Sequence, residues 1–118
     1  MPRRDWRLRV ADMLDGAETA ISLAVGLSRA GFLNDRVLVD AAIKNITVVG
    51  EAAAHIPDEV AERWPEIPWR DIRDMRNFIV HEYFGVNPDV LWGTVTEDLP
   101  EIVPVLRRML EAGRPPAG

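Results

Sequence analysis

The stretch that decides the fold is residues 34–57, NDRVLVDAAIKNITVVGEAAAHIP. Its apolar side chains recur at steps of three and four residues, the period of an amphipathic α-helix; they are Leu38, Ala41, Ala42, Ile46, Val49, Ala53 and Ile56. Asn34 or Asp35 can cap this helix, and Pro57 must end it. Because the stretch is rich in alanine, we expect the helix to pack closely against its neighbours.

Two helical segments flank this stretch. Upstream, residues 6–31 are expected to form one helix that ends near Gly31, with an apolar stripe made of Val10, Met13, Leu14, Ala17, Ile21, Ala24, Val25 and Leu27. Downstream, Asp58 can cap a short helix that reaches Trp64. Pro65 and Pro68 then require an extended connector.

Two more helices are expected after the connector. One runs from Asp71 to about Phe84, with Gly85 available as a C-terminal cap. The other opens at Asn87–Pro88, and Pro100 and Pro104 must kink or divide it. Strand signals are weak throughout. The sequence therefore predicts an all-α fold, an antiparallel, up-and-down bundle of four to five helices.

Length and composition limit the number of domains and the classes of partner that the chain can have. The chain has 118 residues, enough for one ordinary domain, which we place at residues 1–112 with a disordered tail at 113–118. It has no cysteine and no apolar run near the ~20 residues that a bilayer requires. The net charge of −5 argues against a broad basic surface that coats nucleic acid. We expect a cytoplasmic protein that binds neither membranes nor DNA, and any contact with RNA must be local.

The side chains best suited to catalysis or ligand binding are concentrated in residues 70–83, RDIRDMRNFIVHEY. On one continuous helix, Arg70, Arg73 and Asn77 would share a face, with His81 one turn beyond Asn77. Arg76 would lie about 140° from His81 on an ideal helix. For both to act on one phosphodiester, the chain needs inward-bending side chains, a distorted helix end, or a second copy across a two-fold axis. We favour the dimer.

These residue types suit RNA cleavage. Histidine titrates near neutral pH and can act as a general acid or base, and the planar guanidinium of Arg76 matches phosphate oxygens. Asn77 could orient the imidazole of His81 or donate to the phosphate. Because RNA carries its own nucleophile, the ribose 2′-hydroxyl, the reaction strictly requires no metal, cofactor or nucleophilic side chain.

The spacing from Arg76 through His81 to Tyr83 matches the Arg-x4-His-x-Tyr motif of HepT-like proteins in the HEPN superfamily. Other matching segments are Gly50–Ala53, Ile56–Pro57, Trp64–Trp69, Arg76–Asn77, His81–Phe84, Leu91–Trp92 and Asp98–Pro100. An Arg-x4-His spacing alone is a weak signal, but its position between the Trp64–Trp69 connector and Leu91–Trp92 makes it specific. Over roughly residues 8–110 the chain resembles this family.

The resemblance implies a HEPN-like helical homodimer whose motif residues face a shared cleft. It implies the toxin of a type VII toxin–antitoxin system, an endoribonuclease that uses Arg76, Asn77 and His81 to cut RNA such as tRNA or mRNA without a metal. We expect Arg70 and Arg73, on the polar face of the helix, to bind the RNA. The resemblance also implies an MntA-like nucleotidyltransferase antitoxin that adds AMP to Tyr83. Such a group would place bulk and negative charge beside the arginines and block the cleft.

Plainer interpretations stand beside these. His55 is most simply a residue at a helix end, and Trp64, Trp69 and Trp92 fit core packing and connector anchoring better than base stacking. Glu51 could pair with a motif arginine or face solvent. Tyr83 could be a tyrosine at the core edge.

The alternative function is a non-catalytic helical module that binds a nucleotidyltransferase or a nucleotide through the same arginines. The acidic net charge and the absence of a broad basic surface favour it.

Overall fold

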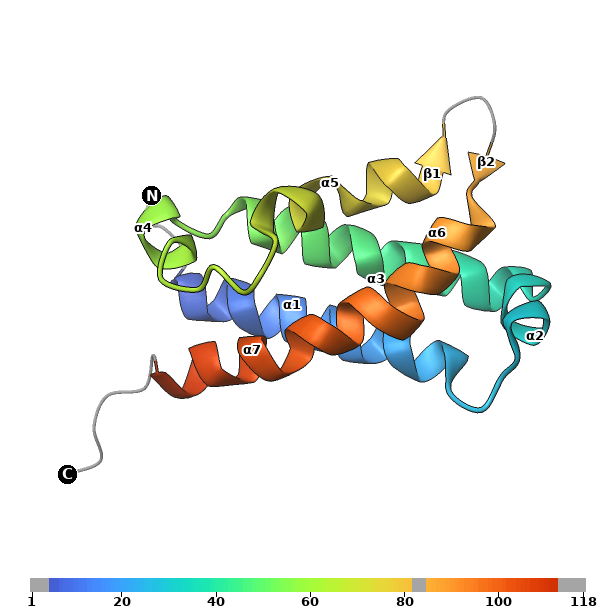
Figure 1. Ribbon diagram of the computed structural model, residues 1–118, viewed down its shortest axis with the longest axis horizontal. Helices are drawn as coiled ribbons and strands as arrows, with labels where there is room; N and C mark the ends of the chain where they lie inside the picture. The colour runs from blue at the N-terminus through green and yellow to red at the C-terminus, as the bar shows by residue number, and fades with distance from the viewer. Residues whose placement is uncertain (1–4, 82–84, 113–118) are drawn as a thin grey trace.

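The computed structural model describes residues 5–81 and 85–112. Helices α1 (Trp6–Ala24), α3 (Arg36–Ala54), α5 (Trp69–Ile79) and α7 (Leu99–Ala112) lie side by side, and successive ones run in opposite directions (Figure 1). Helix α3 packs between α1 and α5, and α7 covers the other side of α1. The fold is therefore the expected all-α, up-and-down bundle.

Helix α3 forms where the sequence predicts it. The Asp35 carboxylate accepts hydrogen bonds from the backbone amides of Val37 (3.0 Å) and Leu38 (3.2 Å), which fixes the start of the helix. The helix ends at Ala54, three residues before Pro57. Most of the predicted stripe is buried, namely Ala42, Ile46, Val49, Ala53 and Ile56.

Two glycines let α3 approach its neighbours closely. A Cβ atom at Gly16 of α1 would lie 2.9 Å from Val49 Cγ2 and 3.1 Å from the Asn45 carbonyl oxygen of α3. A Cβ atom at Gly50 of α3 would lie 3.1 Å from the Ile72 carbonyl oxygen of α5. Close backbone approach of this kind requires a residue without a side chain. The position of α5 against α3 therefore depends on Gly50.

The first helix is shorter than predicted. Helix α1 ends at Ala24, and Gly26 adopts a positive φ of 77°. The Ser28 hydroxyl then accepts a hydrogen bond from the Gly31 amide at 3.0 Å and caps a separate helix, α2 (Arg29–Leu33). The expectation of one helix to Gly31 was wrong because a left-handed glycine and a new cap interrupt it.

Helix α2 closes one end of the bundle. Its Phe32 is fully buried and lies against Trp92, with ring centroids 5.8 Å apart. Arg29 forms an ion pair with Asp89 at the start of α6. These contacts hold α2 to the C-terminal part of the chain.

The short helix before the connector also differs slightly. Helix α4 (Asp58–Ala61) has Pro57 at its N-cap position and Asp58 as its first residue. Asp58 makes no capping hydrogen bond, so its predicted role as the cap was wrong. It lies instead in the first turn, where a negative charge is favourable.

Two side chains fix the connector that leads into α5. The Trp69 indole donates to the carbonyl oxygens of Ala61 and Trp64, both at 3.1 Å. Arg108 of α7 lies 3.3 Å from the Glu66 carboxylate and 5.9 Å from the centre of the Trp64 ring. These contacts match the expectation that Trp64 and Trp69 anchor the connector, and they determine where α5 begins.

The C-terminal helical run stays continuous despite its prolines. Helix α6 (Pro88–Gly93) is capped by the Asn87 side chain, as predicted, and passes through a π-helical turn, η1 (Thr94–Asp98), into α7. At the end of η1 the Leu99 amide donates a hydrogen bond to the carbonyl oxygen of Thr94, five residues earlier. The wider turn comes just before Pro100, which has no amide hydrogen to donate. The run is therefore modified before Pro100 without being divided, and Pro104 lies inside α7.

Helix α5 ends five residues earlier than predicted. After Ile79 the chain is extended, and β1 (Val80–His81) pairs antiparallel with β2 (Gly85–Val86), placing Val80 opposite Val86 and His81 opposite Gly85. The Asn87 amide donates to the Ile79 carbonyl at 2.7 Å. Gly85 has a positive φ of 75° but lies in a hairpin and not at a helix end, so its predicted role as a C-terminal cap was wrong. The prediction of a helix to about Phe84 was therefore wrong at this point, where the two short strands follow only weak strand signals in the sequence.

Within the described ranges, no helix is both long and apolar enough to cross a membrane. The expected tail, residues 113–118, lies outside the described residues.

Candidate active site

Helix α5 separates its apolar and polar side chains sharply. Ile72, Met75 and Ile79 are at most 5% exposed and face the core. The opposite sides carry exposed polar residues, namely Arg70, Asp71, Asp74, Arg76 and Asn77. Because the connector fixes the start of α5 and Gly50 fixes its distance from α3, these polar residues have defined positions on the surface.

Arg73 differs from the other arginines of α5. It is half-buried, and its Nε donates to the Ala53 carbonyl oxygen in the last turn of α3 at 3.2 Å. A cation at the C-terminal end of a helix is favourable there. Arg73 therefore joins α5 to α3, in addition to any contact with a ligand that its remaining donors could make.

Arg76 and Asn77 face solvent near the end of α5. In the part of the chain that the structure describes, neither makes a side-chain hydrogen bond or an ion pair. Arg70 is likewise exposed, at the start of the helix. The donors of Arg70, Arg76 and Asn77 are thus available to a ligand.

His81 is exposed but does not belong to α5. It lies in β1, two residues after the last helical residue, so the angle of about 140° from Arg76 on an ideal helix does not describe it. A distorted helix end, one of the three arrangements considered, is present in this chain. The angular mismatch therefore no longer supports a dimer, and only the resemblance does.

The helix ends there for local reasons. Ile79 and Val80 are adjacent β-branched residues, and Val80 has extended angles of φ −110° and ψ 118°. Gly85 permits the return of the hairpin. The β-branched pair and the glycine are visible in the sequence. The helical period of the preceding residues nevertheless led to the prediction of a longer helix.

The remaining predicted residues have simple placements. Tyr83 lies outside the described residues. His55 is the exposed C-cap of α3, as expected. Glu51 is exposed and makes no ion pair with any described residue, so pairing with a motif arginine is not observed. Trp92 packs against Phe32 in the core.

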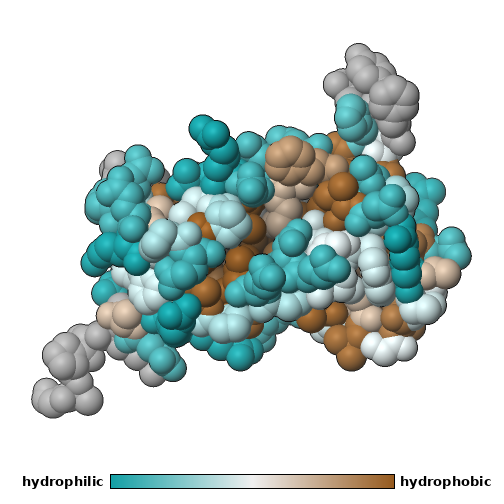
Figure 2. Space-filling model, viewed as in Figure 1, coloured by the Kyte–Doolittle hydropathy of each residue, from teal (hydrophilic) through white to brown (hydrophobic). Residues whose placement is uncertain are grey.

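A cleft beside the candidate site was not predicted from the sequence. It lies between α5 and the α6–α7 run, has a volume of about 450 Å³, and shows apolar side chains between hydrophilic rims in Figure 2. Desolvation, followed by the nearby charges of Glu101 and Glu97, raises the pKa of Asp98 at this cleft. The sequence signal was an acidic group, Glu97, Asp98 and Glu101, within an apolar helical stripe.

The arrangement can support phosphate recognition and proton transfer. The exposed guanidinium of Arg76 and amide of Asn77 can donate to phosphate oxygens, and the imidazole of His81 can carry a proton. Among the described residues, no group of three or more His, Cys, Asp or Glu side chains is arranged to hold a metal ion.

Comparison with known proteins identifies the family. The family model described as "Ribonuclease HepT-like" matches residues 13–109. Similar proteins include "Probable ribonuclease HepT" of Thermococcus cleftensis, which is 39% identical over 95 residues that cover 77% of this chain and 86% of the relative. A protein of Caldanaerobacter subterraneus named as a "Putative RNase" is 33% identical over 99 residues, 84% of this chain and 88% of the relative.

A protein with the same kind of name from Methanocaldococcus jannaschii is 31% identical over 102 residues, which cover 86% of this chain and 94% of the relative. No solved structure matches the chain significantly. Because the family model spans most of the chain and these relatives are covered over most of their length, the chain belongs to the ribonuclease HepT-like family.

Proposed function

We propose that this chain is a metal-independent endoribonuclease that cleaves RNA through Arg76, Asn77 and His81. The observation that carries the proposal is the exposure of all three residues where α5 gives way to β1. Membership of the ribonuclease HepT-like family and the names of the relatives agree with it. Arg70 adds a further exposed cation on the same helix for RNA binding.

The reaction is an internal transesterification. The ribose 2′-oxygen attacks the adjacent phosphorus, and the bond from phosphorus to the 5′-oxygen of the next nucleotide breaks. His81 accepts the 2′-hydroxyl proton as general base or protonates the departing 5′-oxygen as general acid. Arg76 stabilises the charge that develops on the phosphate, and Asn77 donates to it or orients the imidazole.

The biological role that we propose is that of the toxin in a type VII toxin–antitoxin system, acting as a homodimer in the cytoplasm. A cognate MntA-like nucleotidyltransferase silences it by adding AMP to Tyr83. In that step the tyrosine oxygen attacks the α-phosphorus of ATP and pyrophosphate leaves. Tyr83 follows His81 by two residues, so an AMP phosphate there lies near the proposed catalytic residues and opposes RNA binding.

The first test is RNA cleavage by purified protein whose Tyr83 is free of AMP. Total RNA and a defined tRNA are incubated in EDTA with the parent, His81→Ala and His55→Ala. We expect cleavage by the parent and by His55→Ala, and a loss of at least about a hundredfold in His81→Ala.

His55 is a matched control because it is the only other histidine and is also exposed. Circular dichroism must show that both variants stay folded. Undiminished cleavage by His81→Ala would refute the assignment. Absence of cleavage by all three proteins would favour the non-catalytic module that binds a nucleotidyltransferase or a nucleotide.

A further inference from the structure

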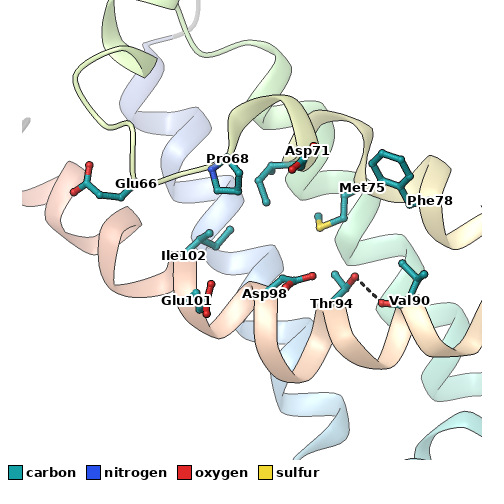
Figure 3. A pocket seen from close by; sticks show the side chains of 11 residues that line it. Glu66, Pro68, Asp71, Met75, Phe78, Val90, Thr94, Asp98, Glu101 and Ile102 are labelled. Carbon is teal, nitrogen blue, oxygen red and sulfur yellow. Dashed lines mark hydrogen bonds between the residues drawn. The ribbon is translucent and has the colours of Figure 1, made fainter.

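The cleft between α5 and the α6–α7 run has apolar walls. Met75 and Phe78 line it from α5, and Val90 and Ile102 line it from the opposite run (Figure 3). Phe78 is 55% exposed although it is aromatic. An exposed aromatic ring beside a concave apolar surface is typical of a surface that a partner covers.

The rim of this cleft is acidic. Asp71 stands on α5, and Asp98 and Glu101 stand on the opposite run (Figure 3). A fourth lining carboxylate, Glu66, is already paired with Arg108. Among the described residues that line the cleft there is no Lys, Arg or His. The cleft therefore attracts cations and repels phosphates.

Apart from Glu66, the carboxylates of the rim lack neutralising partners among the described residues. Asp71, Asp98 and Glu101 form no ion pair with any described residue. The raised pKa of Asp98 follows in part from the charge of Glu101 beside it. A positive group from outside would relieve this repulsion.

We infer that the cleft is a docking site for a segment of a partner protein that carries a bulky apolar side chain flanked by lysines or arginines. The apolar side chain enters between Met75 and Ile102, and the cations lie against Asp71, Asp98 and Glu101. Charge complementarity selects this occupant. RNA is a poorer occupant because the acidic rim would repel its phosphates. A small polyamine is also poorer because it would leave the apolar walls uncovered.

The proposed site is separate from the ribonuclease residues but shares a helix with two of them, Arg76 and Asn77. Arg76 and Asn77 lie between Met75 and Phe78 along α5. A segment bound in the cleft would therefore cover one side of the helix that carries the proposed catalytic arginine. The inference does not depend on the proposed ribonuclease activity, because binding is measured without RNA.

The test uses a labelled synthetic peptide with leucines at helical spacing and lysines between them. Its affinity is measured with the parent, with Asp98→Lys/Glu101→Lys in the cleft, and with Asp40→Lys/Glu51→Lys on α3. Both double variants change the net charge equally. We expect the cleft variant to bind at least about tenfold more weakly, and the α3 variant to bind nearly as well as the parent.

The position of the peptide is read from the NMR signals of the Met75 and Ile102 methyl groups, which should shift on binding. A second peptide, with the same lysines but serine in place of leucine, should bind much more weakly. Equal binding of the two peptides would overturn the role of the apolar walls and indicate a simple cation site. Equal weakening by the two double variants would show unspecific attraction.

Two further outcomes would also overturn the inference. One is a shift of the same methyl signals by an RNA oligonucleotide. The other is a parent dimer, seen by light scattering, that becomes monomeric in Asp98→Lys/Glu101→Lys, because a second copy would then occupy the cleft.

Discussion

The arginines of α5 differ in what surrounds them. Arg73 is half-buried and donates to the Ala53 carbonyl oxygen, whereas Arg70 and Arg76 are exposed and make no such contact with described residues. The three arginines have identical side chains, so the residue type alone does not distinguish them. Their positions relative to the end of α3 decide that one of them stabilises the fold and the other two remain available to a ligand.

The first prediction at this scale concerns stability. Arg73→Ala removes a charged hydrogen bond at the α3–α5 contact and should lower the free energy of unfolding by about 1 kcal/mol. Arg70→Ala should change it by less than about 0.5 kcal/mol, because Arg70 is exposed. Urea unfolding followed by circular dichroism measures both values. Equal effects would contradict the structural role of Arg73.

The second prediction concerns Asp98. Its pKa is raised in the folded protein, so the folded state binds this proton more readily than the unfolded state. Stability from this group is therefore present at low pH and is lost as pH rises through the window between the ordinary and the raised pKa. Asp98→Asn should be more stable than the parent at pH 7, and the difference should shrink as the pH falls below the raised pKa. Urea unfolding across pH tests this, and a constant difference would count against it.

At the scale of the elements, Gly50 determines how α5 lies on α3. A methyl group there would stand 3.1 Å from the Ile72 carbonyl oxygen and 3.3 Å from that of Arg73. Both atoms belong to backbone that is held by helical hydrogen bonds, so they cannot move independently. The helix carrying two of the proposed catalytic residues, Arg76 and Asn77, is thus positioned by a residue that has no side chain.

Gly50→Ala should therefore lower the free energy of unfolding by about 1–3 kcal/mol, the usual cost of overpacking. Gly93→Ala is the matched control, because Gly93 is helical and a Cβ atom there meets nothing within 4 Å. That variant should be more stable than the parent by up to about 1 kcal/mol. A stabilising effect of Gly50→Ala would show that α5 can move away from α3.

The elements also show what could be predicted from the sequence. The α3 stripe, the Asn87 cap and the bundle were predictable, because helical period and capping act over a few residues. The end of α5 was not predictable in this way. After Ile79 the chain enters a hairpin whose second strand begins only at Gly85, six residues later. The cleft was also out of reach, since Met75 and Ile102 meet only in the folded bundle.

At the scale of the whole molecule, the charge limits how RNA can be held. The chain has a net charge of −5, and the exposed arginines of the proposed site are few. Binding that releases counterions from many phosphates is therefore not expected. The RNA should be held locally, near the end of α5.

This predicts a weak dependence of RNA affinity on salt. If two or three arginines contact phosphates of single-stranded RNA, log KM should rise with log salt concentration with a slope between about 1.4 and about 2.1. Cleavage of a defined oligonucleotide between low and moderate salt measures the slope. A much steeper value would reveal a wider basic surface than the described residues provide.

The π-helical turn before Pro100 has a consequence for how this surface can change over generations. Such a turn amounts to one extra residue in an α-helix. Losing one codon within Thr94–Asp98 would restore regular winding and leave the residues on either side of the turn facing nearly as they do now, because the wider turn already absorbs the extra residue. Because this turn lies within the wall that faces α5, one small deletion could reshape that wall locally while the residues beyond the turn keep their directions and the bundle remains.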